Sequence, residues 1–409
     1  MRKPELLVPA SSLEVLKIAT VFGADAVYIG GEAFGLRAKA RNFFKRKRWR
    51  RELHLPIEHG VKVYVTVNIL AHNYDLAGVR EYLKELKELK PDALIIADPG
   101  IFTYAKEICP EIERHISTQA NNTNYETYRF WYKLGAKRVV TARELSLEEI
   151  RQIRANIPDD MEIETFIHGA MCISYSGRCL LSNFLVGRDA NQGACTHPCR
   201  WKYSIVEESR PGEYMPVYEN ERGTYIFNSK DLCMIEHMDD ILTSGIDSLK
   251  IEGRMKTALY VATVARTYRK AIDDYLEDPA KYQANMSWYQ EQIAGCTYRK
   301  FTTGFFYGKP SEEAQIYDNN TYEKGYTYLG FAEAVDERGY VQITQRNKFT
   351  VGEMIEIMKP DGTNLLVPVK AIYDEEGNSV ESAPHPQQKL FVDLGGEAEV
   401  YDILRRSEA

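Results

Sequence analysis

The chain has 409 residues, 44% hydrophobic and 27% charged, a composition typical of a soluble globular protein. Its net charge of −7 at pH 7 argues against a protein that binds nucleic acid through its overall charge. No run of about 18 apolar residues occurs, and Glu5, Pro9 and Ser11 interrupt the N-terminal one, so we expect no membrane span, no secretory signal and a cytoplasmic location.

Short apolar runs alternate with helical patterns over the first two thirds of the chain. Eight strands are expected, at residues 5–10, 25–31, 61–70, 92–98, 113–119, 137–142, 161–169 and 247–253. Most of the intervening segments have the spacing of amphipathic helices, and one more helix is expected at residues 256–276. Such repeats indicate an α/β fold with a parallel sheet buried on both faces. We predict a TIM-like (β/α) barrel, with an open doubly wound sheet as the alternative.

The predicted barrel domain covers residues 1–276 and carries a cysteine-rich insertion at about 170–233. A helical connector and linker are expected over residues 277–325. From residue 326 the texture changes to short alternating runs separated by turn signals such as KPDG. Residues 326–409 are therefore predicted to form a small all-β barrel domain, with strands at 340–346, 350–358, 364–373, 389–394 and 398–404.

Five of the seven cysteines lie within the insertion and are separated by gaps that glycine and proline turns can close: Cys172, Cys179, Cys195, Cys199 and Cys233. In a reducing compartment such a group predicts metal binding more than disulfides. Thiolates suit either zinc or an iron–sulfur cluster. Gaps of six and fifteen residues favour a cluster wrapped by a long loop. Buried core cysteines or a reactive thiol are the other interpretations.

Polar residues follow the predicted strands at the end that carries the active site of a barrel. These candidates for catalysis or ligand binding are Gln119, Arg143, His168, Lys250, Glu252 and Arg254, with Asn68 and Asp98 beside them. Each also has a structural interpretation. Asp98 can cap the next helix, Arg143 can pair with Glu144 or Glu148, and His168 can be a core histidine. The cluster at residues 250–254 is either an anion site or an ion-pair network.

A basic segment at residues 37–51 contrasts with the acidic chain. Phe43, Phe44 and Trp49 are interleaved with its cations, and aromatic rings can stack on bases while cations neutralise phosphates. A solvated basic helix is the other interpretation. The candidate RNA-binding residues are Arg41, Lys45, Arg46, Lys47, Arg48, Arg50 and Arg51.

Residues 164–182, ETFIHGAMCISYSGRCLLS, resemble the signature of peptidase family U32, the collagenase-like peptidases. Further blocks of this resemblance are STQANNTN at 117–124, CRWKY at 199–203, NSKDLC at 228–233, LKIEGRMK at 249–256 and FTTGFF at 301–306. The resemblance covers essentially the whole chain and implies the barrel and the C-terminal β domain.

Members with this cysteine pattern resemble oxygen-independent hydroxylation proteins that carry a [4Fe–4S] cluster. The branch most similar to this chain forms 5-hydroxyuridine at the tRNA wobble position, which implies tRNA as substrate, prephenate or a similar small carboxylate as hydroxyl source, and a paralogous family member as partner. Other relatives act on a ribosomal RNA cytidine or a quinone precursor. The implied cluster ligands are Cys172, Cys179, Cys195 and Cys199, with Cys233 a rival for the fourth place.

Arg143, Lys250 and Arg254 are candidates for binding the carboxylates of the hydroxyl source. Two other functions stay open. One is a collagenase-like peptidase, although the sequence contains no HExxH or GxSxG motif. The other is a zinc-binding protein that serves as an RNA scaffold.

Overall fold

A computed structural model describes most of the chain: residues 2–30, 54–172, 174–191, 195–200, 204–205, 215–216, 228–296, 300–310, 315–316 and 325–408. The basic segment, and with it every predicted RNA-binding residue, lies outside the described residues. The chain divides into two compact units. The first comprises Met1–Leu16, Asp25–Met255 and Arg299–Thr321, and the second comprises Lys17–Ala24, Lys256–Tyr298 and Tyr322–Ala409.

Eight parallel strands form a closed barrel in the first unit. In order around the barrel they are β1 (Glu5–Ala10), β2 (Ala26–Gly30), β3 (Lys62–Val67), β4 (Ala93–Ile96), β5 (Glu113–Ile116), β6 (Arg138–Val140), β7 (Glu162–Ala170) and β12 (Ser248–Ile251). Closure is made by β12, which pairs with both β1 and β7. The strands are almost wholly buried, as apolar runs of this kind require. The predicted TIM-like barrel is thus confirmed.

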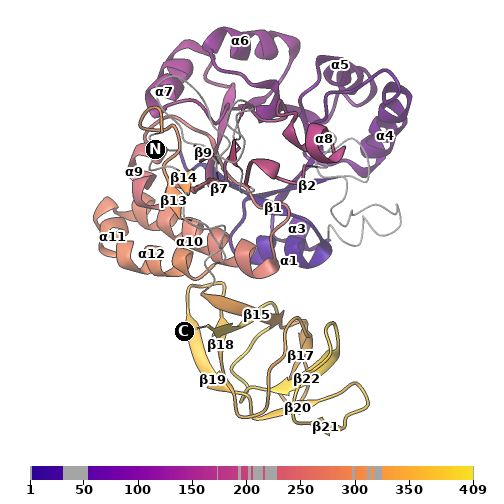
Figure 1. The fold of residues 1–409 in the computed structure, drawn as a ribbon, viewed down its shortest axis with the longest axis vertical. Helices are drawn as coiled ribbons and strands as arrows, with labels where there is room; N and C mark the ends of the chain where they lie inside the picture. The colour runs from indigo at the N-terminus through magenta and orange to yellow at the C-terminus, as the bar shows by residue number, and fades with distance from the viewer. Residues whose placement is uncertain are drawn as a thin grey trace. The chain divides into compact units, whose positions relative to one another are not determined.

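Several helices that follow these strands begin at residues whose side chains cap them. Asn124 caps α6 (Tyr125–Leu134), and Ser146 with Glu149 forms a capping box on α7 (Leu147–Asn156). Asp98 accepts two backbone bonds at the start of α5 (Pro99–Ile108), which confirms its capping role. Figure 1 shows these helices outside the strands, together with α4 (Leu76–Leu89). Other short helices among the described residues are α1 (Leu13–Val21), α3 (His54–Glu58), α8 (Leu181–Val186) and α9 (Met238–Leu242).

One rim of the barrel is extended next to β7. The short strand β11 (Asp231–Cys233) pairs antiparallel with the end of β7, and β13 (Phe301–Thr302) pairs with β11. One edge of β7 pairs with β12. The other edge pairs with β6 near the start of β7 and with β11 near its end. Small two-stranded ladders join β8 (Ser204–Ile205) to β9 (Met215–Pro216) and β10 (Asn228–Ser229) to β14 (Gln315–Ile316). The insertion is therefore anchored to the sheet at Cys233.

Among its described residues, the second unit contains part of α1, three further helices and two antiparallel sheets. The helices are α10 (Ala258–Glu277), α11 (Pro279–Ala284) and α12 (Met286–Ala294). One sheet has the order β15 (Tyr326–Phe331), β23 (Ile403–Ser407), β18 (Met354–Met358) and β19 (Asn364–Pro368). The other has the order β16 (Ala334–Val335), β17 (Val341–Thr344), β22 (Lys389–Asp393), β20 (Ala371–Tyr373) and β21 (Ser379–Val380). The expected all-β region is confirmed, but the strand predicted at 364–373 is two strands.

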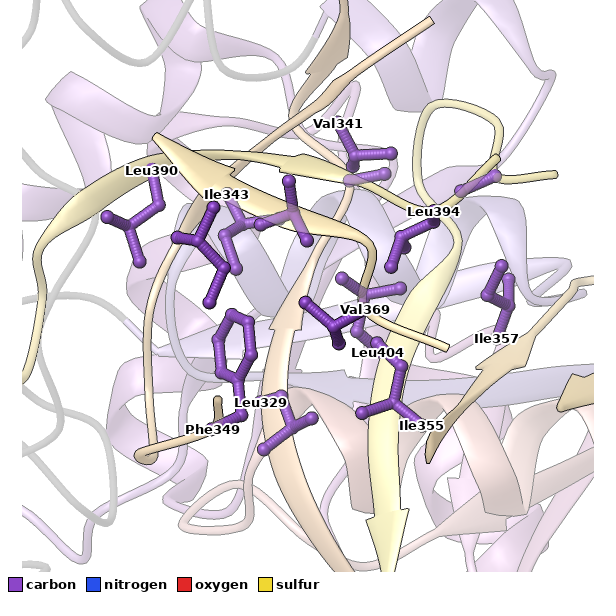
Figure 2. Packing of buried hydrophobic residues seen from close by; sticks show 14 of the residues in the cluster. Leu329, Val341, Ile343, Phe349, Ile355, Ile357, Val369, Leu390, Leu394 and Leu404 are labelled. Carbon is purple, nitrogen blue, oxygen red and sulfur yellow. The ribbon is translucent and has the colours of Figure 1, made fainter. Parts of the chain in front are cut away.

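Both sheets enclose one apolar core. Figure 2 shows side chains from the two sheets converging, among them Leu329, Ile343, Ile355 and Leu404. A buried guanidinium ties this domain to the helices of its own unit. Arg266 of α10 donates to the Lys359 and Asn364 oxygens at 2.8 and 3.0 Å, and to Gln292 of α12 at 2.6 Å. Burial and the neighbouring Arg405 lower the pKa of Arg266 to about 9.

Candidate functional site at the barrel mouth

An ion-pair network fills the barrel interior near the N-terminal ends of the strands. Arg138 donates to Glu5 at 2.6 Å, to Glu162 at 2.7 Å and to Glu164 at 3.1 Å. Lys250 donates its Nζ to the second oxygen of Glu164 at 2.7 Å. Glu164 is fully buried, so its charge requires these partners. Lys250, predicted as a site residue, therefore has a buried carboxylate partner.

The network holds its carboxylates in the ionised form. Burial opposes ionisation of Glu5, but the adjacent Arg138 outweighs it and lowers the pKa of Glu5 to about 2. Burial likewise opposes ionisation of Glu164, and Lys250 with Arg138 keeps its pKa below the ordinary value. Burial and Arg138 together lower the pKa of His115. This arrangement is suited to holding a barrel together, since its charges satisfy one another.

Arg143 lies at the opposite end, directly after β6, and contacts the start of the insertion. Its Nη1 donates to the Ala170 carbonyl at 2.8 Å and lies 3.9 Å from Cys172 Sγ. Its Nη2 lies 3.6 Å from Glu252 Oε2. The guanidinium stacks 4.1 Å from the centre of the Phe166 ring. Arg143 thus joins the ends of β6, β7 and β12 beside the first cysteine.

The structure gives Arg143 a different partner from either one proposed on sequence. Its ion pair is with Glu252, whereas Glu148 accepts a hydrogen bond from Gln152. Glu144 is partly buried, and burial raises the pKa of its carboxyl despite the neighbouring Arg143. Sequence proximity was misleading because the Arg143 guanidinium contacts residues at the ends of the neighbouring strands β7 and β12.

Gln119 lies in a single helical turn, Thr118–Ala120, that follows β5. It is 4% exposed, and its Oε1 has no hydrogen-bond partner among the described residues. A Cβ on Gly177 would lie 3.0 Å from Gln119 Nε2, so the insertion passes directly over this side chain. Asn121 Nδ2 reaches the Ser176 carbonyl at 3.5 Å. Gln119 therefore supports the segment between the first two cysteines.

Arg254 and Asn68 occupy the mouth on the side of β2 and β3. Arg254 is 5% exposed and donates from Nη1 to Thr66 Oγ1 at 3.0 Å. Its other terminal nitrogen occupies the space above Gly30, where a Cβ would lie 2.1 Å away. Asn68 donates to Ser117 Oγ at 3.3 Å. The structure thus brings a second cation to the mouth beside neutral polar groups.

His168 and Glu252 meet where β7 leaves the barrel. The Glu252 amide donates to the His168 carbonyl at 2.8 Å, and the His168 ring lies 5.7 Å from that of Phe301. Gly169 has φ of +110°, and a Cβ there would lie 2.5 Å from the Glu252 carbonyl oxygen. Glycine is therefore required for β7 to turn toward the insertion.

The five candidate ligands form two groups, which differ in the elements that hold them. Cys172 is exposed, two residues beyond β7, and the buried Cys233 is held in β11 opposite His168. Cys179, Cys195 and Cys199 are partly exposed and lie on turns around α8. Ser182 of α8 accepts from the Thr196 amide at 3.0 Å, which places the Cys195 segment beside the one that begins at Cys179.

The thiols fit a cluster by donor chemistry. The five cysteines of the insertion follow or flank β7 and β11 at the mouth. No three His, Cys, Asp or Glu side chains within the described part of the chain are arranged to hold a metal ion. Cys109 and Cys296, the two cysteines outside the insertion, are buried, and burial raises the pKa of Cys109 to about 11.

A small cavity lies behind Arg143, lined also by Phe166, Met171 and Phe306. Its volume of about 10 Å³ is no larger than the space that one water molecule needs. A substrate cannot bind there without rearrangement.

In the described part of the chain, we find no helix with the length and apolar composition needed to span a lipid bilayer.

The ion-pair network around Arg138 was not anticipated from sequence. The sequence nevertheless contained an indication of this network, because Glu5, Arg138 and Glu162 are charged residues at the first positions of buried strands. Three such charges on strands that share one barrel end must face one another or solvent. Glu164, inside β7, is fully buried and pairs with both Arg138 and Lys250.

Comparison with known proteins gives matches along the whole chain. The model of peptidase family U32 matches residues 11–316, and that of the peptidase family U32 C-terminal domain matches residues 324–405. The chain is 42% identical over 408 residues to tRNA hydroxylation protein P1 of Bacillus subtilis (strain 168), covering 100% of this chain and 96% of that protein. It is 35% identical to tRNA hydroxylation protein P2 of the same organism, covering 75% and 98%. It is also 33% identical to a collagenase of Porphyromonas gingivalis, covering 83% and 84%.

Proposed function

Because the chain belongs to peptidase family U32, we propose that it acts as the family members named for tRNA hydroxylation do, and hydroxylates tRNA. The observation that carries this proposal is the similarity to such a protein over the full length of both chains. We assign it to RNA-modifying enzymes that convert the wobble uridine to 5-hydroxyuridine without molecular oxygen.

The proposed cofactor is a [4Fe–4S] cluster at the barrel mouth. Cys172, just after β7, and Cys233, in β11, would provide two of the ligands. Two of Cys179, Cys195 and Cys199 would complete the set. A bound cluster supplies electron transfer and Lewis-acidic iron. The Arg143 guanidinium, 3.9 Å from Cys172 Sγ, adds a fixed positive charge that offsets the negative charge of thiolates.

The proposed hydroxyl donor is prephenate. In the overall exchange the uridine C5–H bond becomes C5–OH, and the C–OH bond of the donor becomes C–H, so that uridine loses the two electrons that the donor gains. Arg143 and Arg254 supply cationic groups at the mouth for donor carboxylates. Lys250 is less suited, because its ammonium group is bonded to Glu164 inside the barrel.

Reconstitution tests the proposal directly. The purified protein, loaded with iron and sulfide without oxygen, is incubated with unmodified tRNA and prephenate carrying ¹⁸O in its ring hydroxyl, and the nucleosides are analysed by mass spectrometry. We expect 5-hydroxyuridine that contains ¹⁸O. Product without the label contradicts prephenate as the donor, and absence of product contradicts the hydroxylase.

Cysteine variants test the cofactor separately. Cys172→Ser and Cys233→Ser are expected to lower the iron and sulfide bound per chain, whereas Cys296→Ser, a buried cysteine outside the insertion, should leave them unchanged. Zinc in place of iron would support a zinc-binding RNA scaffold. The similarity to a collagenase favours peptidase activity as the second candidate function. That function requires cleavage of gelatin by iron-free protein, which we expect to be absent.

A further inference from the structure

The helix α8 exposes apolar side chains beside the cysteines, instead of burying them. Phe184 is 85% exposed and Leu180 is 70% exposed, and Leu185, Val186 and Tyr175 are also exposed. We call these five residues the α8 patch. Large apolar side chains gathered on a surface typically mark a binding site. Within α8 only Ser182 is buried, so packing against the described residues does not explain the helix's composition.

The position of the patch connects it to the proposed chemistry. Cys179 comes two residues before α8, and the Ser182–Thr196 hydrogen bonds hold the Cys195 segment against the helix. The turn that contains Cys199 also packs on α8. Any molecule that covers the α8 patch therefore lies beside three of the five candidate ligands.

The charges around the patch favour an anionic partner. Between Met171 and Arg200 the chain has three arginines, one aspartate and no lysine or glutamate, in a protein whose net charge is −7. Arg178 is exposed between Tyr175 and the helix, and Arg188 lies two residues after the helix ends. Exposed aromatic rings flanked by arginines are the combination with which proteins bind unpaired nucleobases, because rings stack on bases and guanidinium groups contact phosphates.

We propose that the α8 patch is the docking surface for unpaired nucleobases of the RNA substrate, with Phe184 as the stacking residue. This inference rests on the proposed function, since it takes tRNA as the occupant. It assigns single-strand recognition to the insertion itself, next to the cysteines, and therefore differs from phosphate binding by the basic segment at residues 37–51.

The test compares binding of an anticodon stem-loop with that of a duplex of the same stem, by fluorescence anisotropy at several salt concentrations. Phe184→Ala is expected to weaken stem-loop binding about tenfold, the loss of about one stacked base. Duplex binding and the salt dependence should not change, because no charge is removed. Phe184→Trp should retain the wild-type affinity, which separates loss of stacking from loss of folding.

Phe130→Ala is the matched control, since Phe130 is a 54% exposed aromatic residue on the outer helix α6. Arg178→Gln should reduce the salt dependence of stem-loop binding by about one released ion. Unchanged stem-loop affinity in Phe184→Ala overturns the inference while leaving the proposed function intact. If Phe184→Ala instead changes the oligomeric state, seen by light scattering, without changing RNA affinity, the inference is also overturned, because the patch is then a protein interface. Wild-type protein that fails to bind tRNA contradicts the proposed function itself.

Discussion

Replacing Arg138 by methionine tests the ion-pair network in the barrel. The guanidinium, 4% exposed, contacts three carboxylates at 2.6 to 3.1 Å. Methionine fills much of the volume but leaves Glu5, Glu162 and Glu164 facing one another without this cation. Removing one member of a buried ion network costs about 3–5 kcal/mol of stability. We expect a loss of this size at pH 7.

The loss should depend on pH in a direction that the structure determines. In the wild-type protein the pKa of Glu5 is about 2, compared with an ordinary value of 4.5. The carboxyl therefore contributes stability that is complete above pH 4.5 and is lost as the pH falls toward 2, and the pKa difference corresponds to about 3 kcal/mol. In R138M this contribution is absent. The stability difference between the two proteins should shrink as the pH falls below about 4.5.

Urea unfolding is measured between pH 3 and pH 7, and hydrogen exchange of peptides from β1 and β7 reports on the barrel rather than on the second unit. Arg129→Met is the control, because Arg129 and Glu126 form an exposed pair that should contribute less than about 1 kcal/mol. A loss below about 1 kcal/mol for R138M at pH 7, or one equal at pH 3 and pH 7, would refute the reasoning.

Three further predictions concern other parts of the molecule. Cys109, fully buried and with a pKa of about 11, should stay unmodified by iodoacetamide at pH 8 under conditions that label exposed Cys172, and equal labelling by mass spectrometry would contradict the burial. Gly177→Ala places a methyl group at φ of +74° against Gln119, and should lower the iron bound per chain, whereas Gly60→Ala, at φ of +66° with open space around it, should not. Arg266→Met should destabilise the second unit by about 3 kcal/mol, seen as faster hydrogen exchange in β18 and β19 with no change in β3 and β4.

Local patterns in the sequence were sufficient for most barrel elements. Runs such as KVYVTV are long, β-branched and bounded by turn residues, so the strand at Lys62–Val67 follows from composition alone. Helix α7 has both its capping box and its apolar spacing within ten residues. The strand β11 has three residues and no periodicity, and its existence depends on the edge that β7 offers. The sequence analysis did not predict the strand β15. It contains a glycine among aromatic residues, and it is a strand because it pairs with β23.

The site could be predicted only as a set of residue types. The clustering of five cysteines is evident from the sequence. Which of them lie beside β7 or in β11, and which lie on turns around α8, depends on the tertiary structure. The pairing of Lys250 with Glu164 depends on β12 lying next to β7, across the entire insertion. The exposure of Phe184 could not be inferred either, because an apolar helix next to a barrel is ordinarily buried.

The position of the closing strand has a consequence for biosynthesis. About 80 residues separate the end of β7 at Ala170 from the start of β12 at Ser248. At roughly 5–20 residues per second a ribosome needs about 4–16 s to produce them. If the first seven strands pair before β12 emerges, β1 and β7 lack during that interval the partner that later covers both. Unprotected strand edges promote association between chains, so we expect aggregation of the nascent chain to be most pronounced in this interval.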